Sequence, residues 1–172
     1  MSLGVLTILG LPAPQGSKSF KGMVIGKRGQ QIPRLVESSK KLPKWRARVA
    51  KQAAMLWQGR EPLDRAVVVS MTFTIPKPTS APKTRRTWPD RKPDASKLAR
   101  AVEDSLTDAG VLADDARIVD LIASKRYPGE GLNALDVPGV LVRIFDAATF
   151  EADVCEIGAA EPVQFDLIGA AA

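Results

Sequence analysis

The sequence predicts a single α/β domain in which a mixed β-sheet is flanked by helices. The chain has 172 residues, which is enough for one domain with its own core and too few for two. Its hydrophobic content of 45% is that of a soluble globular protein. Strand-like and helix-like patterns alternate along the chain without the strict spacing of repeated βαβ units, and no internal repeat is visible.

The first part of the chain is predicted to contain a strand, a hairpin and a helix. Residues 5–11 alternate weakly between apolar and polar side chains, as a strand does. Residues 23–25 and 32–36 are predicted to pair as a short hairpin around the sequence GKRGQQ. A helix is predicted from Pro43 to about Gln58, since proline suits a first turn. Its apolar side chains recur at four-residue spacing and form one buried stripe: Trp45, Val49, Ala53 and Trp57.

The second part is predicted to contain three strands and a helix. Residues 66–75 (AVVVSMTFTI) are rich in β-branched side chains and predict a central strand. Residues 76–94 hold five prolines and six basic residues and are predicted to form a loop. Helix signals return over residues 95–108, and residues 118–127 and 140–145 are predicted to be strands.

The charge is distributed unevenly along the chain. There are 25 Lys and Arg against 19 Asp and Glu, for a net charge of +6. No basic residue follows Phe145, whereas six acidic residues do, so residues 1–145 carry +12. A basic body indicates a polyanionic partner, with a merely soluble basic protein as the alternative. We expect a domain over residues 1–145 and a weakly ordered, acidic, Ala/Gly-rich tail over residues 146–172.

The composition excludes several kinds of catalytic site. The chain has no histidine and one cysteine, Cys155, which excludes ordinary zinc sites, Ser/His/Asp triads and Cys/His pairs. It has no GxxxxGK[ST] loop, so no nucleotide cofactor is expected. A single cysteine fits a reducing compartment, and the apolar run from Leu3 to Leu11 is too short to span a bilayer. We therefore expect a cytoplasmic protein without a membrane partner.

Carboxylates are the remaining candidates for catalysis, and with water as further ligand they favour Mg²⁺ or Mn²⁺. The candidates are Asp94, Asp104, Asp108, Asp114, Asp115 and Asp120. Each has a structural alternative. Asp94 precedes a predicted helix and fits an N-cap. Asp104 and Asp108 fall opposite the apolar side of that helix, where solvated charges are expected, and the Asp114–Asp115 pair fits a polar turn.

The joint arrangement of these residues carries a resemblance. The segment KPDASKLARAVEDSLTDAGVLADDARIVDLIASKRY resembles the central segment of the RusA-type Holliday junction resolvases. That family has an Asp-x-Asp-[Asn/Lys]-Leu run, a basic residue one turn later, an Asp-Ala/Ser-Leu, a Gly, an Asp-Asp and a strand. Here these elements are residues 94–98, Arg100, residues 104–106, Gly110, residues 114–115 and residues 118–125. The segments APQGSK and VESSKKLPKWR also resemble phage-borne members, so the resemblance covers about residues 5–145.

The resemblance implies a RusA-like fold and an endonuclease that cuts four-way DNA junctions as a homodimer, with Mg²⁺ or Mn²⁺ as cofactor. It implies Asp94, Asp114, Asp115 and Ser96 as the metal-site positions, with Asp94, Asp115 and Arg100 as catalytic residues. The chain departs from the family pattern at Ser96, where the family has its second aspartate. The site then functions without that carboxylate, is weakened, or belongs to a branched-DNA-binding protein that no longer cleaves.

Helix geometry limits which aspartates can share an ion. Asp104 lies about 15 Å along the helix from Asp94, too far for both to bind one ion. The eight steps from Thr107 to Asp115 can return about 26 Å if extended, so Asp115 can reach Asp94. Otherwise the site has to be shared between two chains.

The candidate DNA contacts are mostly basic residues of the loop that leads into Asp94. A proline-stiffened basic loop suits the phosphate backbone. Trp88 either stacks on an unpaired base or anchors the loop to the body. The predicted contacts are Lys18, Lys83, Arg85, Arg86, Trp88, Arg91, Lys92, Lys97 and Lys125, with Arg126 as a further phosphate candidate.

Overall fold

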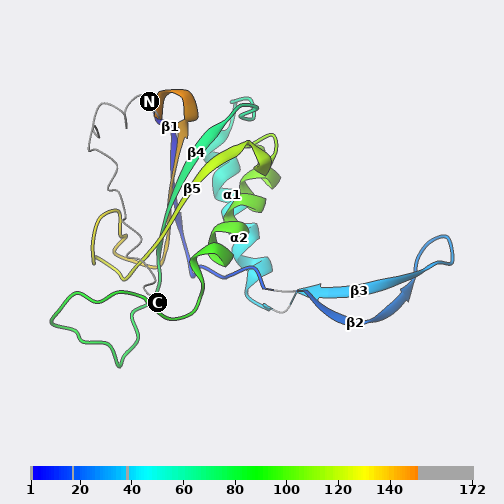
Figure 1. The fold of residues 1–172 in the computed structure, drawn as a ribbon, viewed down its shortest axis with the longest axis horizontal. Coiled ribbons are helices and arrows are strands. Elements are labelled where there is room, and N and C mark those ends of the chain that lie inside the picture. Colours follow the sequence, from blue (N-terminus) through cyan, green and yellow to red (C-terminus); the bar gives the residue numbers. More distant parts are fainter. Residues whose placement is uncertain (1, 17, 38, 151–172) are drawn as a thin grey trace, which may run out of the picture.

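A computed structural model describes residues 2–16, 18–37 and 39–150 of the chain (Figure 1). Its elements follow one another as a strand, a hairpin, a helix, a strand, a helix, a 3-10 turn and two strands. Their bounds are β1 Ser2–Leu9, β2 Lys18–Ile25, β3 Gln31–Glu37, α1 Leu42–Trp57, β4 Val67–Thr74, α2 Ala95–Asp108, η1 Asp115–Arg117, β5 Ile118–Arg126 and β6 Gly139–Asp146. Every predicted strand and helix is present, with ends shifted by a few residues.

The main sheet has four strands in the order β1-β6-β4-β5. Strand β4 runs parallel to β5 and antiparallel to β6, which confirms the predicted mixed sheet. It is the most buried strand, as its run of β-branched residues predicted. Strand β5 lies at an edge of the sheet, with β1 at the other edge. The fold is therefore an α/β domain, as predicted.

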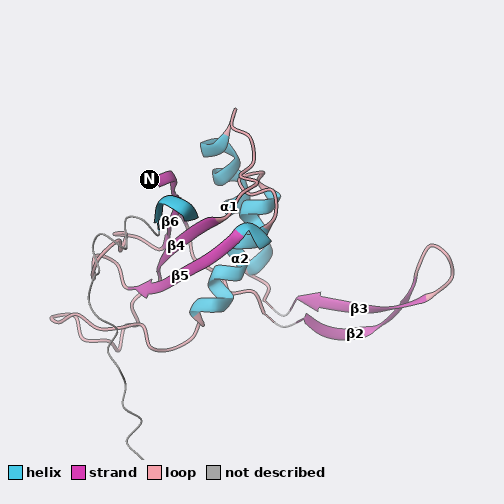
Figure 2. Cartoon of the chain, turned by 45° about the horizontal axis from the view of Figure 1, so that its top comes forward, coloured by secondary structure: helices cyan, strands magenta, loops and turns pink. Residues whose placement is uncertain are grey.

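Both long helices pack against the same face of this sheet and form one core with it (Figure 2). The predicted stripe of α1 is buried in full, from Trp45 to Trp57. Helix α2 contributes Leu98, Val102 and Leu106, whose exposed fractions are all 0%. Burying a side chain of this size stabilises a fold by about 1.5–3 kcal/mol. Within the described residues, both long helices thus cover one side of the sheet, as the predicted helix-flanked sheet requires.

Ion pairs also connect the two helices. Arg46 of α1 lies 3.2 Å from Asp104 and 2.7 Å from Asp108, both on α2. Asp108 is exposed, as expected of a solvated surface charge, whereas the side chain of Asp104 is only partly exposed. They face the neighbouring helix, because α2 packs against α1 as well as against the sheet. Both carboxylates therefore already have a cationic partner within the chain.

Helix α2 is the crossover between two parallel strands, and this position decides where its ends lie. The chain leaves the C-terminal end of β4, passes through the loop of residues 75–94, and runs along α2 in the opposite direction. It then enters β5, which is parallel to β4. The N-terminus of α2 therefore lies near the C-terminal ends of β4 and β5, and its C-terminus lies near their beginnings.

Two remaining regions lie apart from this core. Strands β2 and β3 form a separate two-stranded sheet that extends away from the body (Figure 1). Strand β6 ends at Asp146, and Phe150 contacts the ring of Phe145 at 5.3 Å between centroids. The rest of the predicted acidic tail, with Cys155, lies outside the described residues. No helix in the part of the chain that is described has the length and hydropathy to cross a membrane.

Candidate active site

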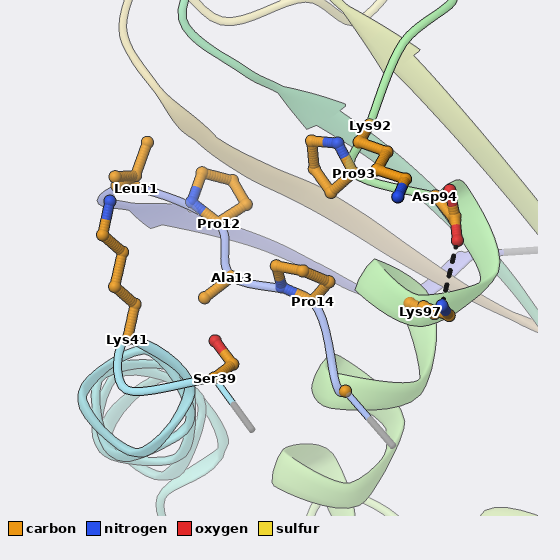
Figure 3. Close-up of a pocket in the computed structure, with 11 residues that line it drawn as sticks. Leu11, Pro12, Ala13, Pro14, Ser39, Lys41, Lys92, Pro93, Asp94 and Lys97 are labelled. Atoms are coloured by element: carbon orange, nitrogen blue, oxygen red, sulfur yellow. Dashed lines mark ion pairs between the residues drawn. The ribbon is translucent and has the colours of Figure 1, made fainter. Parts of the chain in front are cut away.

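Asp94 lies at the N-terminal end of α2, where the sequence allowed either a helix cap or a metal ligand. The residue occupies the N-cap position, with φ −72° and ψ 138°, but its side chain makes no capping hydrogen bond. Its Oδ2 lies instead 3.2 Å from Nζ of Lys97, a residue predicted to contact DNA (Figure 3). The capping interpretation is therefore wrong, and the carboxylate pairs with the ammonium group of Lys97 rather than with the helix N–H groups.

A cavity of about 530 Å³ opens beside this carboxylate, between the segment before β2 and the start of α2. Its apolar lining comes from Leu11, Pro12, Ala13, Pro14 and Pro93. Three lysines also line it, with Lys92 and Lys97 on the side of Asp94 and Lys41 across the opening (Figure 3). Ammonium groups attract phosphate and a carboxylate attracts a cation, so this opening suits a phosphate with its metal ion.

The basic loop is fixed to the end of β5 immediately before Asp94. Nζ of Lys125 donates to the carbonyl oxygens of Arg91 at 2.8 Å and Pro93 at 3.0 Å. The predicted DNA contact at Lys125 thus has a second use in the structure, because its ammonium group holds the chain on either side of Lys92. A backbone hydrogen bond of 2.8 Å from Gln15 to the carbonyl of Lys97 fixes the opposite wall. These contacts position Asp94.

The Asp114–Asp115 pair divides into two different roles. Oδ1 of Asp114 accepts the N–H of Ala116 at 2.8 Å, which is the polar-turn role that the sequence allowed. Asp115 follows it in η1 and is exposed. Among the described residues, no hydrogen bond or ion pair of the Asp115 carboxylate is found. Asp115 is therefore the better of the two candidates for an external cation.

One chain does not bring Asp115 to Asp94. Asp115 lies just before the beginning of β5, whereas Asp94 follows Pro93, whose carbonyl is bound at the end of β5. A nine-residue strand spans about 30 Å. Across the described ranges, no three Asp, Glu, Cys or His side chains gather as a group that fits a metal ion. The segment after α2 therefore does not return to Asp94, although its length would allow it to do so.

Glu103 is a carboxylate near Asp115 that the sequence analysis missed. It lies half-buried on α2, and its Oε1 is buried without a hydrogen-bond partner in the described structure. Burial raises the pKa of Glu103 above its usual range, the negative charges of Asp115 and Asp104 raise it further, and Arg100 lowers it. The three-residue spacing from Arg100 to Glu103, one helical turn, was the available signal. Lys41 of the cavity was not among the candidate residues, although it lies in the segment VESSKKLPKWR, which contributes to the resemblance.

The basic loop of residues 76–94 is held in shape by an acidic residue from beyond β5. Glu130 forms an ion pair with Lys77 and accepts the N–H of Thr87 at 3.1 Å. The hydrogen bond from Lys77, followed by that from Thr87, lowers the pKa of Glu130 below its usual range. The carboxylate therefore stays ionised and keeps the loop closed at neutral pH.

The predicted DNA contacts of this loop are exposed. Lys83, Arg85, Arg86, Arg91 and Lys92 all face solvent. Trp88 is 58% exposed, and its ring lies under two guanidinium groups, that of Arg86 at 4.2 Å and that of Arg126 at 5.0 Å. Trp88 thus joins the loop to the end of β5, as its anchoring interpretation requires, and still presents much of its ring to solvent. The side chain of Lys18 lies outside the described residues.

Comparison with known protein families places this geometry in context. The family model described as Endodeoxyribonuclease RusA matches residues 14–138. This range includes the basic loop, α2, β5 and most of the residues that line the cavity. No curated protein matches the chain.

Proposed function

Because the chain belongs to the RusA endodeoxyribonuclease family, we propose that it cuts four-way DNA junctions as a homodimer with Mg²⁺ or Mn²⁺. The observation that carries the proposal is the position of Asp94. Its carboxylate is not used as a helix cap and lies beside a cavity lined by three lysines. That arrangement suits a scissile phosphate together with a divalent cation.

The donor set fits a divalent ion only if two chains contribute to it. Asp94 and Asp115 are separated by the length of β5 in one chain. Strand β5 is an edge strand with exposed apolar side chains at Val119, Leu121 and Ile122. Such an edge tends to pair with another strand. We therefore propose that the metal site is shared between two chains, which is the alternative that the sequence left open.

A two-fold axis through β5 accounts for such a shared site. If two copies of β5 pair antiparallel, the beginning of one strand meets the end of the other. Asp115 of one chain then approaches Asp94 of the partner subunit, and the same happens at the second site. Two equivalent sites suit a junction that is itself nearly two-fold symmetric.

Each group of the proposed site has a definable task. Asp94 of one chain and Asp115 of the other would hold the ion, with Asp114 adding negative charge beside it. The ion, when bound, activates water and stabilises charge at the phosphate. Lys41, Lys92 and Lys97 bind and orient the phosphate from the cavity. Arg100 adds positive charge one helical turn further along α2.

Ser96 is exposed in the first turn of α2, two residues from Asp94. We expect Ser96→Asp to lower the Mg²⁺ concentration for half-maximal cleavage by about tenfold, since each added carboxylate raises the affinity of a metal site. The helix dipole tolerates a negative charge there. Ser96→Asn, which adds the shape without the charge, is the matched control. Equal Mg²⁺ dependence of wild type and Ser96→Asp would mean that the site never needed this ligand.

The exposed arginines of the basic loop give a second prediction. Arg85→Ala/Arg86→Ala should weaken binding to junction and duplex alike and reduce the slope of log K against log salt by up to about 1.8, since each phosphate contact contributes about 0.9. Arg85→Lys/Arg86→Lys keeps both charges and should keep the slope. Fluorescence anisotropy from about 50 to 200 mM salt measures both. An unchanged slope in the alanine variant would show that these arginines do not contact DNA.

A non-catalytic protein that binds branched DNA is the second candidate function. It is favoured by Ser96 at a metal-site position and by the lack of a three-carboxylate group in the described part of one chain. Incubating a labelled synthetic four-way junction with the full chain, with Mg²⁺ or with EDTA, separates the two functions. Paired nicks that require the metal support the nuclease. Tight binding without nicks at any Mg²⁺ or Mn²⁺ concentration supports the second candidate.

A further inference from the structure

The hairpin of β2 and β3 projects from the body as an arm (Figures 1 and 2). Its two strands pair with each other and with no other strand of the described chain. None of the backbone hydrogen bonds described for residues 18–37 reaches the helices or the main sheet. A two-stranded hairpin alone is marginally stable in water, so contact with a surface outside its own chain would stabilise this arm.

The arm is apolar on both faces. Val24 and Ile32 are cross-strand partners on one face and are 42% and 41% exposed. Met23 and Ile25 lie on the other face, since side chains alternate along a strand, and are 51% and 80% exposed. Soluble proteins seldom present apolar side chains on both sides of a projecting ribbon unless something covers them.

The arm is also strongly basic. Residues 18–37 contain five cationic residues, Lys18, Lys21, Lys27, Arg28 and Arg34, against the single acidic residue Glu37. Lys27 and Arg28 are exposed at its tip. From this charge we infer that the arm binds in a groove of a duplex arm of the DNA substrate, an inference that rests on the proposed function. The phosphate backbone complements this charge, which favours DNA as the partner of the arm.

The tip is built to present its two cations in a fixed way. Gly26 donates to the carbonyl of Gln30 at 2.8 Å, and Gly29 donates to that of Gly26 at 2.9 Å. The N–H of Arg28 donates to Oε1 of Gln30 at 3.1 Å. Gly29 has φ +76°, a backbone conformation that favours glycine at this turn. Lys27 and Arg28 therefore project from an ordered turn.

The dimensions of the arm match duplex DNA that leaves the candidate site. A two-stranded β-ribbon fits the major groove, which is about 12 Å wide. The eight residues of β2 extend about 25 Å, which corresponds to about 7 base pairs. Gly16 precedes β2 and Ser39 follows β3, and both residues line the cavity that Asp94 also lines. The ribbon thus leads outward from the proposed cleavage site.

Binding of full-length variants to duplex and to four-way junctions tests the arm. Arg28→Ala should weaken binding about five- to tenfold at 0.1 M salt and reduce the salt slope by about 0.9. Lys51→Ala removes one exposed charge from α1 and is the matched control, with wild-type affinity expected.

Ile25→Gln should weaken DNA binding without a change in the salt slope. Trimming the junction arms from about 15 to about 5 base pairs should remove the difference between Arg28→Ala and wild type.

Other results would either contradict the inference that the arm binds DNA or separate it from the proposed nuclease activity. If Arg28→Ala binds DNA with the affinity and the salt slope of wild type, the arm does not bind DNA. Dissociation of a dimer by Ile25→Gln in sedimentation equilibrium with unchanged DNA binding would also contradict the inference, because the arm would then cover a second copy of the chain. If wild type binds duplex but never cuts, the proposed function fails. The arm still stands if Arg28→Ala weakens that duplex binding as expected.

Discussion

Asp94→Asn and Asp115→Asn, each made alone, should reduce metal-dependent cleavage of a four-way junction by at least about a thousandfold. Asparagine keeps the shape of the side chain and removes the charge that binds the ion. Junction binding in EDTA should stay within about twofold of wild type, since neither carboxylate is a phosphate contact. Single-turnover cleavage of a labelled junction and binding in EDTA measure the two effects separately.

The fold should not suffer from these substitutions. The Asp94 side chain makes no capping hydrogen bond, and Asp115 is exposed, so stability should change by about 0.5 kcal/mol or less. Asp108→Asn is the matched control. It removes an aspartate of α2 that is paired with Arg46 at 2.7 Å, and it should cut like wild type. Full cleavage by Asp94→Asn or Asp115→Asn would remove that residue from the site.

Val119→Lys/Ile122→Lys should convert a dimer into a monomer and abolish cleavage with it. These two side chains are 56% and 47% exposed on the edge strand β5. Lysines on an edge strand prevent its pairing with another strand, through charge repulsion and loss of apolar contact. Sedimentation equilibrium and junction cleavage measure the two effects on the same sample.

The control for this variant places the same change on a surface that has no part in the proposed pairing. Met55 and Leu56 are 67% and 52% exposed on α1. Met55→Lys/Leu56→Lys should remain dimeric and active. If the β5 variant also remains a dimer and cuts normally, the two chains do not meet at this strand.

The architecture was predictable because it depends on local pattern. The apolar stripe of α1 repeats every four residues, and all four of its members are buried. Strand β4 is rich in β-branched side chains and is buried along nearly its whole length, as a central strand is. The hairpin was recognised, but its strands are longer than expected, since alternation alone does not show where pairing ends.

The position of Asp115 was not predictable, because it depends on tertiary packing of the segment after α2. Chain length allowed that segment to return to Asp94. In the structure Val111 and Leu112 are buried, and the backbone of Leu63 binds Val111 and Ala113 at 2.9 and 3.1 Å. These contacts keep the segment at the C-terminal end of α2. Nothing in the motif itself indicates that Leu63 holds it there.

The roles of individual basic residues were also not predictable from the sequence. Composition identified a cationic surface but did not separate charges for DNA from charges for structure. Lys125 holds the loop, Lys97 pairs with Asp94, and Arg46 joins the two helices. Each partner comes from a distant segment or a neighbouring turn, and a count of charges does not identify it.

Mixing two inactive variants tests the shared site most directly. In a dimer of one Asp94→Asn chain and one Asp115→Asn chain, both changes fall in one of the two proposed sites and the other site keeps both aspartates. Equal mixing with free exchange of subunits gives half mixed dimers, so about a quarter of wild-type nicking should return. The products should be single nicks rather than paired ones. If the mixture stays as inactive as either variant alone while mass spectrometry shows mixed dimers, Asp94 and Asp115 do not meet across two chains.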